Sequence, residues 1–342
     1  MPATSEAALD RQKKVKRERE ASRRQSYRSS QEDSIHLELD RKFTISTQTD
    51  LTKFDSIDHI PVGEDSKCLS GRPNLTVADR KTEEIILQRI SPTSYDKMLE
   101  TRASAEAGRI LFDQYLDKKT PGWTIQRGKN SAKKLKITIN KRKVIEHHLG
   151  IWHSRGKNSL DFTKETTFHR YKEEALELLD WARQHTDLVM KTAKASIHPS
   201  FRSNIKARSK GRKWLTSIFG ERSIELLHPW WTTIAFFSNF AGGIHVDQDD
   251  CIPSFLFNFG EPAWIELPEY SVKVLVEPLE LVILNSRTFY HRTRPFDPFL
   301  HGSSLLGYRW AFSGFFRDGI FNREPVSKVA KWRLDAIFKK QS

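Results

Sequence analysis

A histidine and an aspartate stand two positions apart in residues 242–250, GGIHVDQDD, as His245 and Asp247. On an extended chain, residues i and i+2 point to the same side, so these two side chains would project together. A third ligand is available from His291, which follows the apolar run 279–286, LELVILNS. Two histidines and one carboxylate with open coordination positions are the ligand set of non-haem Fe(II) oxygenases. The alternative is a polar loop, because an H-x-D pair often arises by chance in a chain with 12 histidines.

An arginine in the segment 307–317, GYRWAFSGFFR, provides a possible anion partner for such a site. In an extended conformation Arg309, Ala311 and Ser313 share one face of the strand. An arginine that faces inward needs an anion, and beside an iron site that anion would be the distal carboxylate of a dicarboxylate cosubstrate. The alternative is a structural ion pair with Asp or Glu.

These residues lie in a part of the chain whose sequence pattern is typical of a β-domain. From residue 230 onwards, short apolar or alternating runs are separated by Gly, Pro and Asn, which is typical of an all-β sandwich or barrel. Upstream, we predict helices at residues 82–90, 95–116 and 167–195 from apolar residues at helical spacing. Residues 135–139 alternate between apolar and polar types, which predicts a half-buried strand with a lysine-rich face.

Charge and composition favour an anionic partner. The net charge of +14 indicates nucleic acid first and an acidic membrane surface second, although a solvated lysine-rich surface is the alternative. Two acid-free basic blocks stand out, at 127–143 and 201–214. We predict that they hold DNA phosphates, rather than forming a solvated linker, through residues of the second block that include Lys206, Arg208, Lys210, Arg212 and Lys213.

The remaining composition excludes several protein classes. Two cysteines far apart, Cys68 and Cys251, rule out a disulfide scaffold. No apolar run approaches the ~20 residues of a membrane span, and the first residues lack the apolar core of a secretory signal. Residues 11–28 are dense in Arg and Lys, as in a nuclear-import patch, a DNA-binding arm or an inert tail. We therefore expect an intracellular, nuclear protein without membrane contact.

Three segments, 245–260, 264–293 and 307–316, resemble the core of the TET/JBP family. These are Fe(II)- and 2-oxoglutarate-dependent oxygenases that act on bases in DNA. The resemblance spans about residues 232–318 and is strongest at H-x-D-x-x-D followed by a short apolar strand ending in Phe-Gly. It implies an α+β fold whose core is a double-stranded β-helix, or jelly roll, with helices packed on one side. The site residues that it implies are His245, Asp247 and His291 for iron, Arg309 for 2-oxoglutarate and Asp250 for a flipped base.

Two departures from the family pattern bear on the substrate. Pro278-Leu279-Glu280 stands where the family has a Gly-Asp turn, and Arg317 stands where close relatives have a base-contacting His. We take Asp250 and Arg317 as the residues that contact the base. An ionised carboxylate only accepts hydrogen bonds, so Asp250 suits the exocyclic amine of cytosine or adenine better than O4 of thymine. The alternative for Asp250 is a solvated turn.

The resulting prediction is a monomeric enzyme that oxidises 5-methylcytosine in double-stranded DNA to 5-hydroxymethylcytosine and higher products. The base would be flipped out of the duplex. Demethylation of N6-methyladenine is the nearest variant. The rivals are an AlkB-like nucleic-acid demethylase, a protein hydroxylase and a non-catalytic basic DNA-binding protein. We predict a disordered basic tail at 1–78 and a dioxygenase domain at 79–342, with a helix-rich part containing basic loops at 79–229 and the jelly-roll core at 230–342.

Overall fold

The structure is a computed structural model, and it is built on two β-sheets that face each other. It describes residues 14–15, 17–18, 21, 34–45, 60–62, 74–92, 97–118, 145–154, 159–238, 242–296, 310–320 and 328–329. Among these residues, the larger sheet has ten strands in the order β1-β3-β4-β11-β8-β13-β7-β5-β6-β14, and the smaller has four in the order β12-β9-β10-β2. The predicted strand at 135–139 and Arg309 lie outside the described residues.

The strands between residues 230 and 320 are divided between the two sheets. They are β7 (Thr233–Ser238), β8 (Ser254–Asn258), β9 (Ala263–Leu267), β10 (Val272–Val276), β11 (Leu281–Leu284), β12 (Arg292–Pro295) and β13 (Trp310–Phe315). Between β7 and β8, an antiparallel backbone bridge joins His245 to His291, next to β12. This bridge places the His245 segment beside β12 of the smaller sheet, as the eighth segment of the core. Strands β11, β8, β13 and β7 of the larger sheet face β10, β9, β12 and the His245 segment. Together they form a double-stranded β-helix, which confirms the predicted jelly roll.

Strand β11 is apolar along its whole length because both of its faces are buried. In β11, Leu281 and Ile283 pack toward the helices, whereas Val282 and Leu284 belong to the cluster between the sheets. We call this second cluster the inter-sheet core and the first the helix-side core. A strand covered on both sides reads as a continuous apolar run and not as an alternation.

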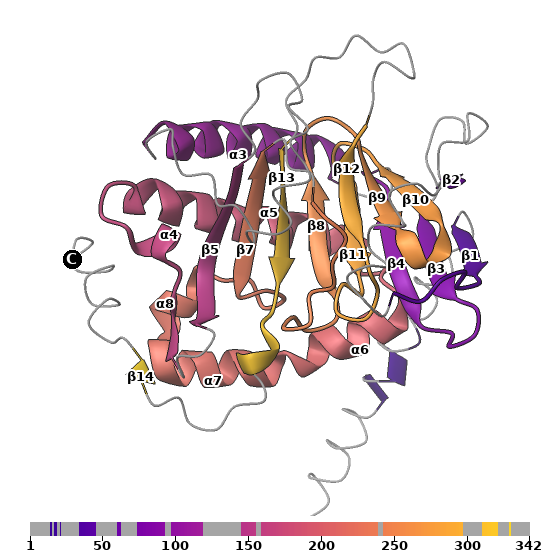
Figure 1. Ribbon diagram of the computed structural model, residues 1–342. Coiled ribbons are helices and arrows are strands. Elements are labelled where there is room, and N and C mark those ends of the chain that lie inside the picture. The colour runs from indigo at the N-terminus through magenta and orange to yellow at the C-terminus, as the bar shows by residue number, and fades with distance from the viewer. Residues whose placement is uncertain are drawn as a thin grey trace, which may run out of the picture.

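Helices cover one face of the larger sheet, as predicted (Figure 1). They are α3 (Met98–Lys118), α4 (Lys164–Thr167), α5 (Lys172–Ala193), α6 (Pro199–Ala207), α7 (Ser209–Phe219) and α8 (Glu221–Glu225), with short 3-10 turns at η3 (Pro268–Tyr270) and η4 (Asp318–Ile320). Trp181 of α5 lies 6.3 Å from the ring of Phe236 and 5.7 Å from that of Trp310. α3 and α5 confirm the helices expected at 95–116 and 167–195. Within the described residues, no helix is both long and apolar enough to cross a membrane.

The helix predicted at residues 82–90 is wrong, because Ile85–Ile90 form strand β4. This strand pairs with β3 (Leu75–Asp79) on one side and with β11 on the other. Leu87 packs in the inter-sheet core and Ile90 in the helix-side core. A short run that is buried on both faces has the same composition as a buried helical turn, so periodicity could not separate the two.

The expectation that residues 1–78 are a disordered tail is also wrong where the structure describes them as strands. β1 (Ile35–Leu39) pairs in parallel with β3, and β2 (Ile60–Val62) pairs with β10. Alternate apolar residues of β1 pack against the inter-sheet core, which explains why this segment is ordered. β5 (Ile145–Ser154), β6 (Ser159–Phe162) and β14 (Lys328–Val329) extend the larger sheet at its other edge, beyond β7.

Candidate metal centre

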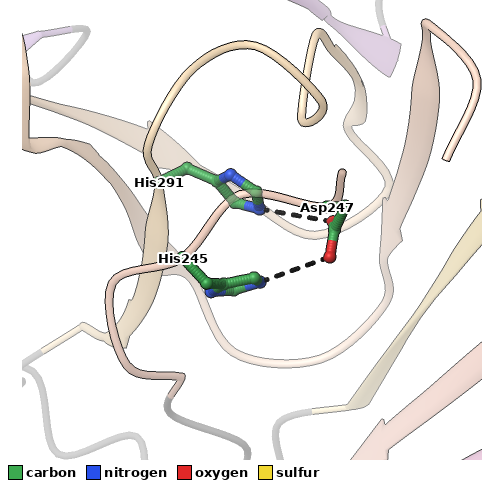
Figure 2. Close-up of side chains that lie close together, drawn as sticks. All are labelled: His245, Asp247 and His291. Atoms are coloured by element: carbon green, nitrogen blue, oxygen red, sulfur yellow. Dashed lines mark ion pairs between the residues drawn. The ribbon is translucent and has the colours of Figure 1, made fainter. Parts of the chain in front are cut away.

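The three predicted ligands converge on one point between the sheets. Figure 2 shows the side chains of His245, Asp247 and His291 pointing toward one another. One ligand atom from each lies within 4.8 Å of the other two. The Asp247 carboxylate lies 3.8 Å from Nε2 of His245 through Oδ1 and 3.7 Å from Nε2 of His291 through Oδ2. Two ligand atoms that each bind one ion at about 2.1 Å lie no more than about 4.2 Å apart, so both of these distances fit a shared ion.

Backbone bonds hold these ligands in place. The two histidines exchange a pair of bonds, from His245 N to His291 O and from His291 N to His245 O, both 3.0 Å long. The backbone N–H of Asp247 donates to Ser286 O at 2.8 Å. The segment that carries the H-x-D pair is therefore fixed to the segment that carries the distal histidine, although 46 positions separate the two histidines in the sequence.

The hydrogen bonds of the imidazoles decide which ring nitrogen faces the centre. Nδ1 of His245 lies 2.7 Å from Gly243 O, and Nδ1 of His291 lies 3.1 Å from Phe289 O. A carbonyl oxygen can only accept, so each Nδ1–H donates to its carbonyl and Nε2 is the ring nitrogen that faces Asp247. This is the arrangement that orients histidines as metal ligands. The donor set of two imidazoles and one carboxylate fits Fe(II).

The ligands open into a cavity of about 80 Å³ between the sheets. The side chains of His245 and Asp247 keep 33% and 24% of their surface exposed, whereas His291 keeps 9%. This exposure leaves room for further groups to reach a bound ion. The cavity is lined by residues of both sheets, among them Ala235, Phe237, Asp250, Ser254, Leu256, Ile265, Thr293, Ser313 and Phe315.

Asp250 lies in the wall of this cavity and is 3% exposed, so it is not a solvated turn residue. Its Oδ1 accepts a bond of 2.7 Å from Nη1 of Arg317. The two residues also form an antiparallel backbone bridge. The structure therefore brings together both residues that we predicted to contact the base, and it adds that they form an ion pair with each other.

Arg309 lies outside the described residues, and of the residues predicted to share its face Ser313 can be placed. Ser313 of β13, four residues further along, is a lining residue. The assignment of Arg309 to 2-oxoglutarate stays a prediction.

The predicted DNA-binding set divides into exposed and buried residues. Lys206, Lys210 and Lys213 are exposed on α6 and α7. Arg208 is 1% exposed and donates to three backbone carbonyls, so the prediction that it binds phosphate is wrong. Arg212 is half-buried and donates to Leu227 O at 3.0 Å, which also commits it to the protein.

The basic block 201–214 is helical and not the loop that we expected. Buried positions of α6 and α7 recur at helical spacing as Phe201, Ile205, Arg208, Leu215 and Phe219. Two of the three arginines of the block, Arg208 and Arg212, fall on this stripe, and the exposed lysines fall off it. A test for helical period would therefore have separated the structural arginines from the surface lysines.

Sequence reasoning missed the contribution of β5 to the site. Trp152 of this strand lies beneath the guanidinium of Arg317, 3.8 Å from its ring centre, and Trp152 is in turn 5.0 Å from the ring of His148. No sequence motif signals this contact, because 165 positions separate Trp152 from Arg317.

Similarity to known proteins is confined to solved structures. No protein-family model matches the sequence, and no curated protein matches it. The chain is similar to a structure described as "NgTET1 in complex with 5mC DNA", with a TM-score of 0.47 and 15% identity, covering 87% of this chain and 100% of that chain. It is also similar to one described as "The structure of OsALKBH1", with a TM-score of 0.32 and 14% identity, covering 67% and 97% respectively. Both TM-scores are low, so we infer the function of this chain from its own fold and side chains.

Proposed function

We propose that this protein is an Fe(II)- and 2-oxoglutarate-dependent dioxygenase that oxidises a methylated base in double-stranded DNA, with 5-methylcytosine as the first substrate to test. The observation that carries the proposal is the centre itself, where two imidazole Nε2 atoms and one carboxylate face a common point in a jelly-roll cavity. When bound there, Fe(II) with 2-oxoglutarate and O2 supplies the oxidising power needed to hydroxylate a methyl group. His245, Asp247 and His291 would hold the ion.

Two features of the cavity wall support a base as the substrate. Phe315 and Phe237 provide flat apolar surfaces on the larger sheet, and Asp250 provides a buried acceptor beside them. A flipped base needs such a combination of stacking surface and edge contact. An acceptor at this position favours a base with an exocyclic amine, so cytosine and adenine fit better than thymine.

The exposed lysines lie on helices that are attached directly to this wall. Arg208, at the junction of α6 and α7, donates to Cys251 O and Pro253 O, just after Asp250 in the chain. Lys206 and Lys210 flank Arg208 in the sequence and are exposed. We propose that they contact DNA phosphates beside the cavity, in a monomeric nuclear enzyme.

The proposal is tested by mass spectrometry of nucleosides. Duplexes that contain 5-methylcytosine or N6-methyladenine are incubated with the full chain, Fe(II), 2-oxoglutarate and O2, and both succinate and oxidised bases are measured. The wild type should form both products, and His245→Ala should form neither. His169→Ala is the matched control, because His169 is exposed on the surface and should keep full activity.

The same experiment separates the rival functions. Parallel reactions with methylated RNA and with protein extracts identify an AlkB-like demethylase or a protein hydroxylase if product forms there and not on DNA. DNA binding without succinate or oxidised base in any reaction would favour the non-catalytic protein. Equal product from the wild type and His245→Ala would refute the assignment of the metal ligands.

A further inference from the structure

Strand β5 lies in the larger sheet beside the jelly roll, and some of its side chains lie on the face of the sheet that lines the cavity. In the pairing of β5 with β7, Glu146 lies opposite Phe237 and His148 lies opposite Ala235. Phe237 and Ala235 line the cavity. Residues directly opposite each other in a ladder project to the same face of a sheet, so Glu146 and His148 continue the cavity wall beyond β7. β5 is not one of the segments that form the jelly roll.

Trp152, further along β5, supports the ion pair in the cavity wall. The guanidinium of Arg317 lies 3.8 Å from the centre of the Trp152 ring and 5.0 Å from that of Phe315. Trp152 itself contacts His148 edge-on, with ring centres 5.0 Å apart. Arg317 is thus stacked between β5 and β13 while its Nη1 bonds Asp250.

The backbone around this pair is fixed as well. Cys251 N donates to Phe316 O at 2.7 Å, and Asp318 N donates to Asp249 O at 2.8 Å. The chain on both sides of Asp250 is therefore bonded to the chain on both sides of Arg317. The side chain of Asp250 is 4% exposed and that of Arg317 is 12% exposed, so the pair is largely removed from water.

A carboxylate this far from water needs a fixed counter-charge to stay ionised and oriented. Arg317 supplies the charge, and the Trp152 ring restricts the rotamers of Arg317 because a guanidinium stacks on an aromatic face. An ionised carboxylate is an acceptor only. The geometry of Trp152, Arg317 and Asp250 therefore determines what edge of a substrate the cavity can accept.

We infer that Trp152 and Arg317 are positioning residues that hold Asp250 as a hydrogen-bond acceptor, and that this chain of three side chains selects a base with an exocyclic amine over one with a carbonyl at the same position. The inference rests on the proposed function and deepens it. It places part of the substrate selectivity on β5, a strand that the metal centre does not need.

5-Methylcytosine and thymine form a matched substrate pair for this inference. Both carry a methyl group at C5, and they differ in the amine or carbonyl at C4 and in the proton at N3. Duplexes with a single 5-methylcytosine or a single thymine at the same site are used separately, and kcat and KM are measured for each. One good base contact discriminates by roughly 10- to 100-fold, so the wild type should prefer 5-methylcytosine by that factor in kcat/KM.

The variants should reduce this preference in a graded way. Arg317→Met and Trp152→Leu should each lower the ratio of the two kcat/KM values by roughly tenfold, mainly through KM for 5-methylcytosine. Trp152→Phe keeps an aromatic face and should retain most of the preference. Thermal unfolding of each variant is measured beside the kinetics, so that the ratio is compared only among folded proteins.

Arg287→Lys is the control for a local ion pair that does not face the cavity. Asp318 follows Arg317 in the chain, and its Oδ1 lies 3.0 Å from Nη1 of Arg287. The side chain of Arg287 is 40% exposed. This variant should keep the wild-type ratio. A wild-type ratio near one, or an unchanged ratio in folded Arg317→Met and Trp152→Leu, would overturn the inference.

Failure of the proposed function gives a different result. If the wild type forms neither succinate nor an oxidised base, the equilibrium Kd values for the same two duplexes replace kcat/KM. Weaker binding of the thymine duplex, with the difference lost in Arg317→Met, would still support the selectivity. Equal Kd values for both duplexes would overturn it.

Discussion

Replacing Arg208 with Met should destabilise the fold without removing a direct contact to DNA. Its guanidinium is buried and donates from Nη1 to Trp230 O and from Nη2 to Cys251 O and Pro253 O. It also lies 5.7 Å from the ring centre of Phe255. Arg208 thus joins the junction of α6 and α7 to the segment that follows Asp250.

The size of the effect follows from two opposing contributions. A hydrogen bond from a charged group stabilises by roughly 2 kcal/mol, so the loss of three such bonds costs on the order of 6 kcal/mol. Burial lowers the pKa of Arg208 from 12.5 to about 10, which corresponds to a cost of about 3 kcal/mol for keeping the charge in the folded protein. Met removes that cost and fills similar space. The net loss of stability should therefore be about 3 kcal/mol.

Urea unfolding followed by tryptophan fluorescence measures this loss, and DNA binding is measured beside it. The triple variant Lys206→Ala, Lys210→Ala, Lys213→Ala provides the contrast. Because these lysines are exposed, the triple variant should change stability by less than about 1 kcal/mol but weaken binding, and its salt slope should fall by about 0.9 for each lost phosphate contact. If Arg208→Met unfolds like the wild type but weakens DNA binding as the lysine variants do, the buried position of Arg208 is wrong.

Three further predictions concern the core. Burial lowers the pKa of His185 from 6.5 to about 3, so the unfolded state binds more protons below pH 6.5. Through this group the free energy of unfolding should fall by about 2 kcal/mol from pH 7 to pH 5. In urea titrations, His185→Gln should not show this fall. Gly108→Ala would place a Cβ 2.0 Å from the Trp181 ring, so it should lower Tm although Ala favours helices, and a raised Tm would contradict the packing of α3 on α5. Burial raises the pKa of Cys251 to about 12, so in a Cys68→Ser background a thiol reagent at pH 8 should react much faster with the unfolded chain than with the folded one.

The metal ligands were predictable because their spacing reflects local geometry. His245 and Asp247 follow the i, i+2 rule, and His291 follows a strand whose apolar run is evident in the sequence. Their convergence depends on the backbone bridge between His245 and His291, which is a non-local pairing. The position of His291 after that apolar run made it the candidate for the third ligand, and the resemblance of the segments implied the same residue.

The errors arose where local patterns have two structural solutions. Residues 85–90 form a mainly apolar strand that is buried on both faces, and the same composition suits a buried helix. In 201–214, the density of basic residues hid a helical stripe on which Arg208 is buried. The Trp152–Arg317 stacking could not be predicted at all, because it depends on β5 joining the larger sheet next to β7.

The central claim is that His245, Asp247 and His291 bind one Fe(II) ion. Anaerobic isothermal titration of the metal-free protein with Fe(II) tests it most directly, since it requires neither substrate nor turnover. We expect one ion per chain in the wild type and in His169→Ala, and loss of this binding in His291→Ala. A wild type that shows no saturable binding, or a His291→Ala variant that binds Fe(II) as tightly as the wild type, would contradict the claim.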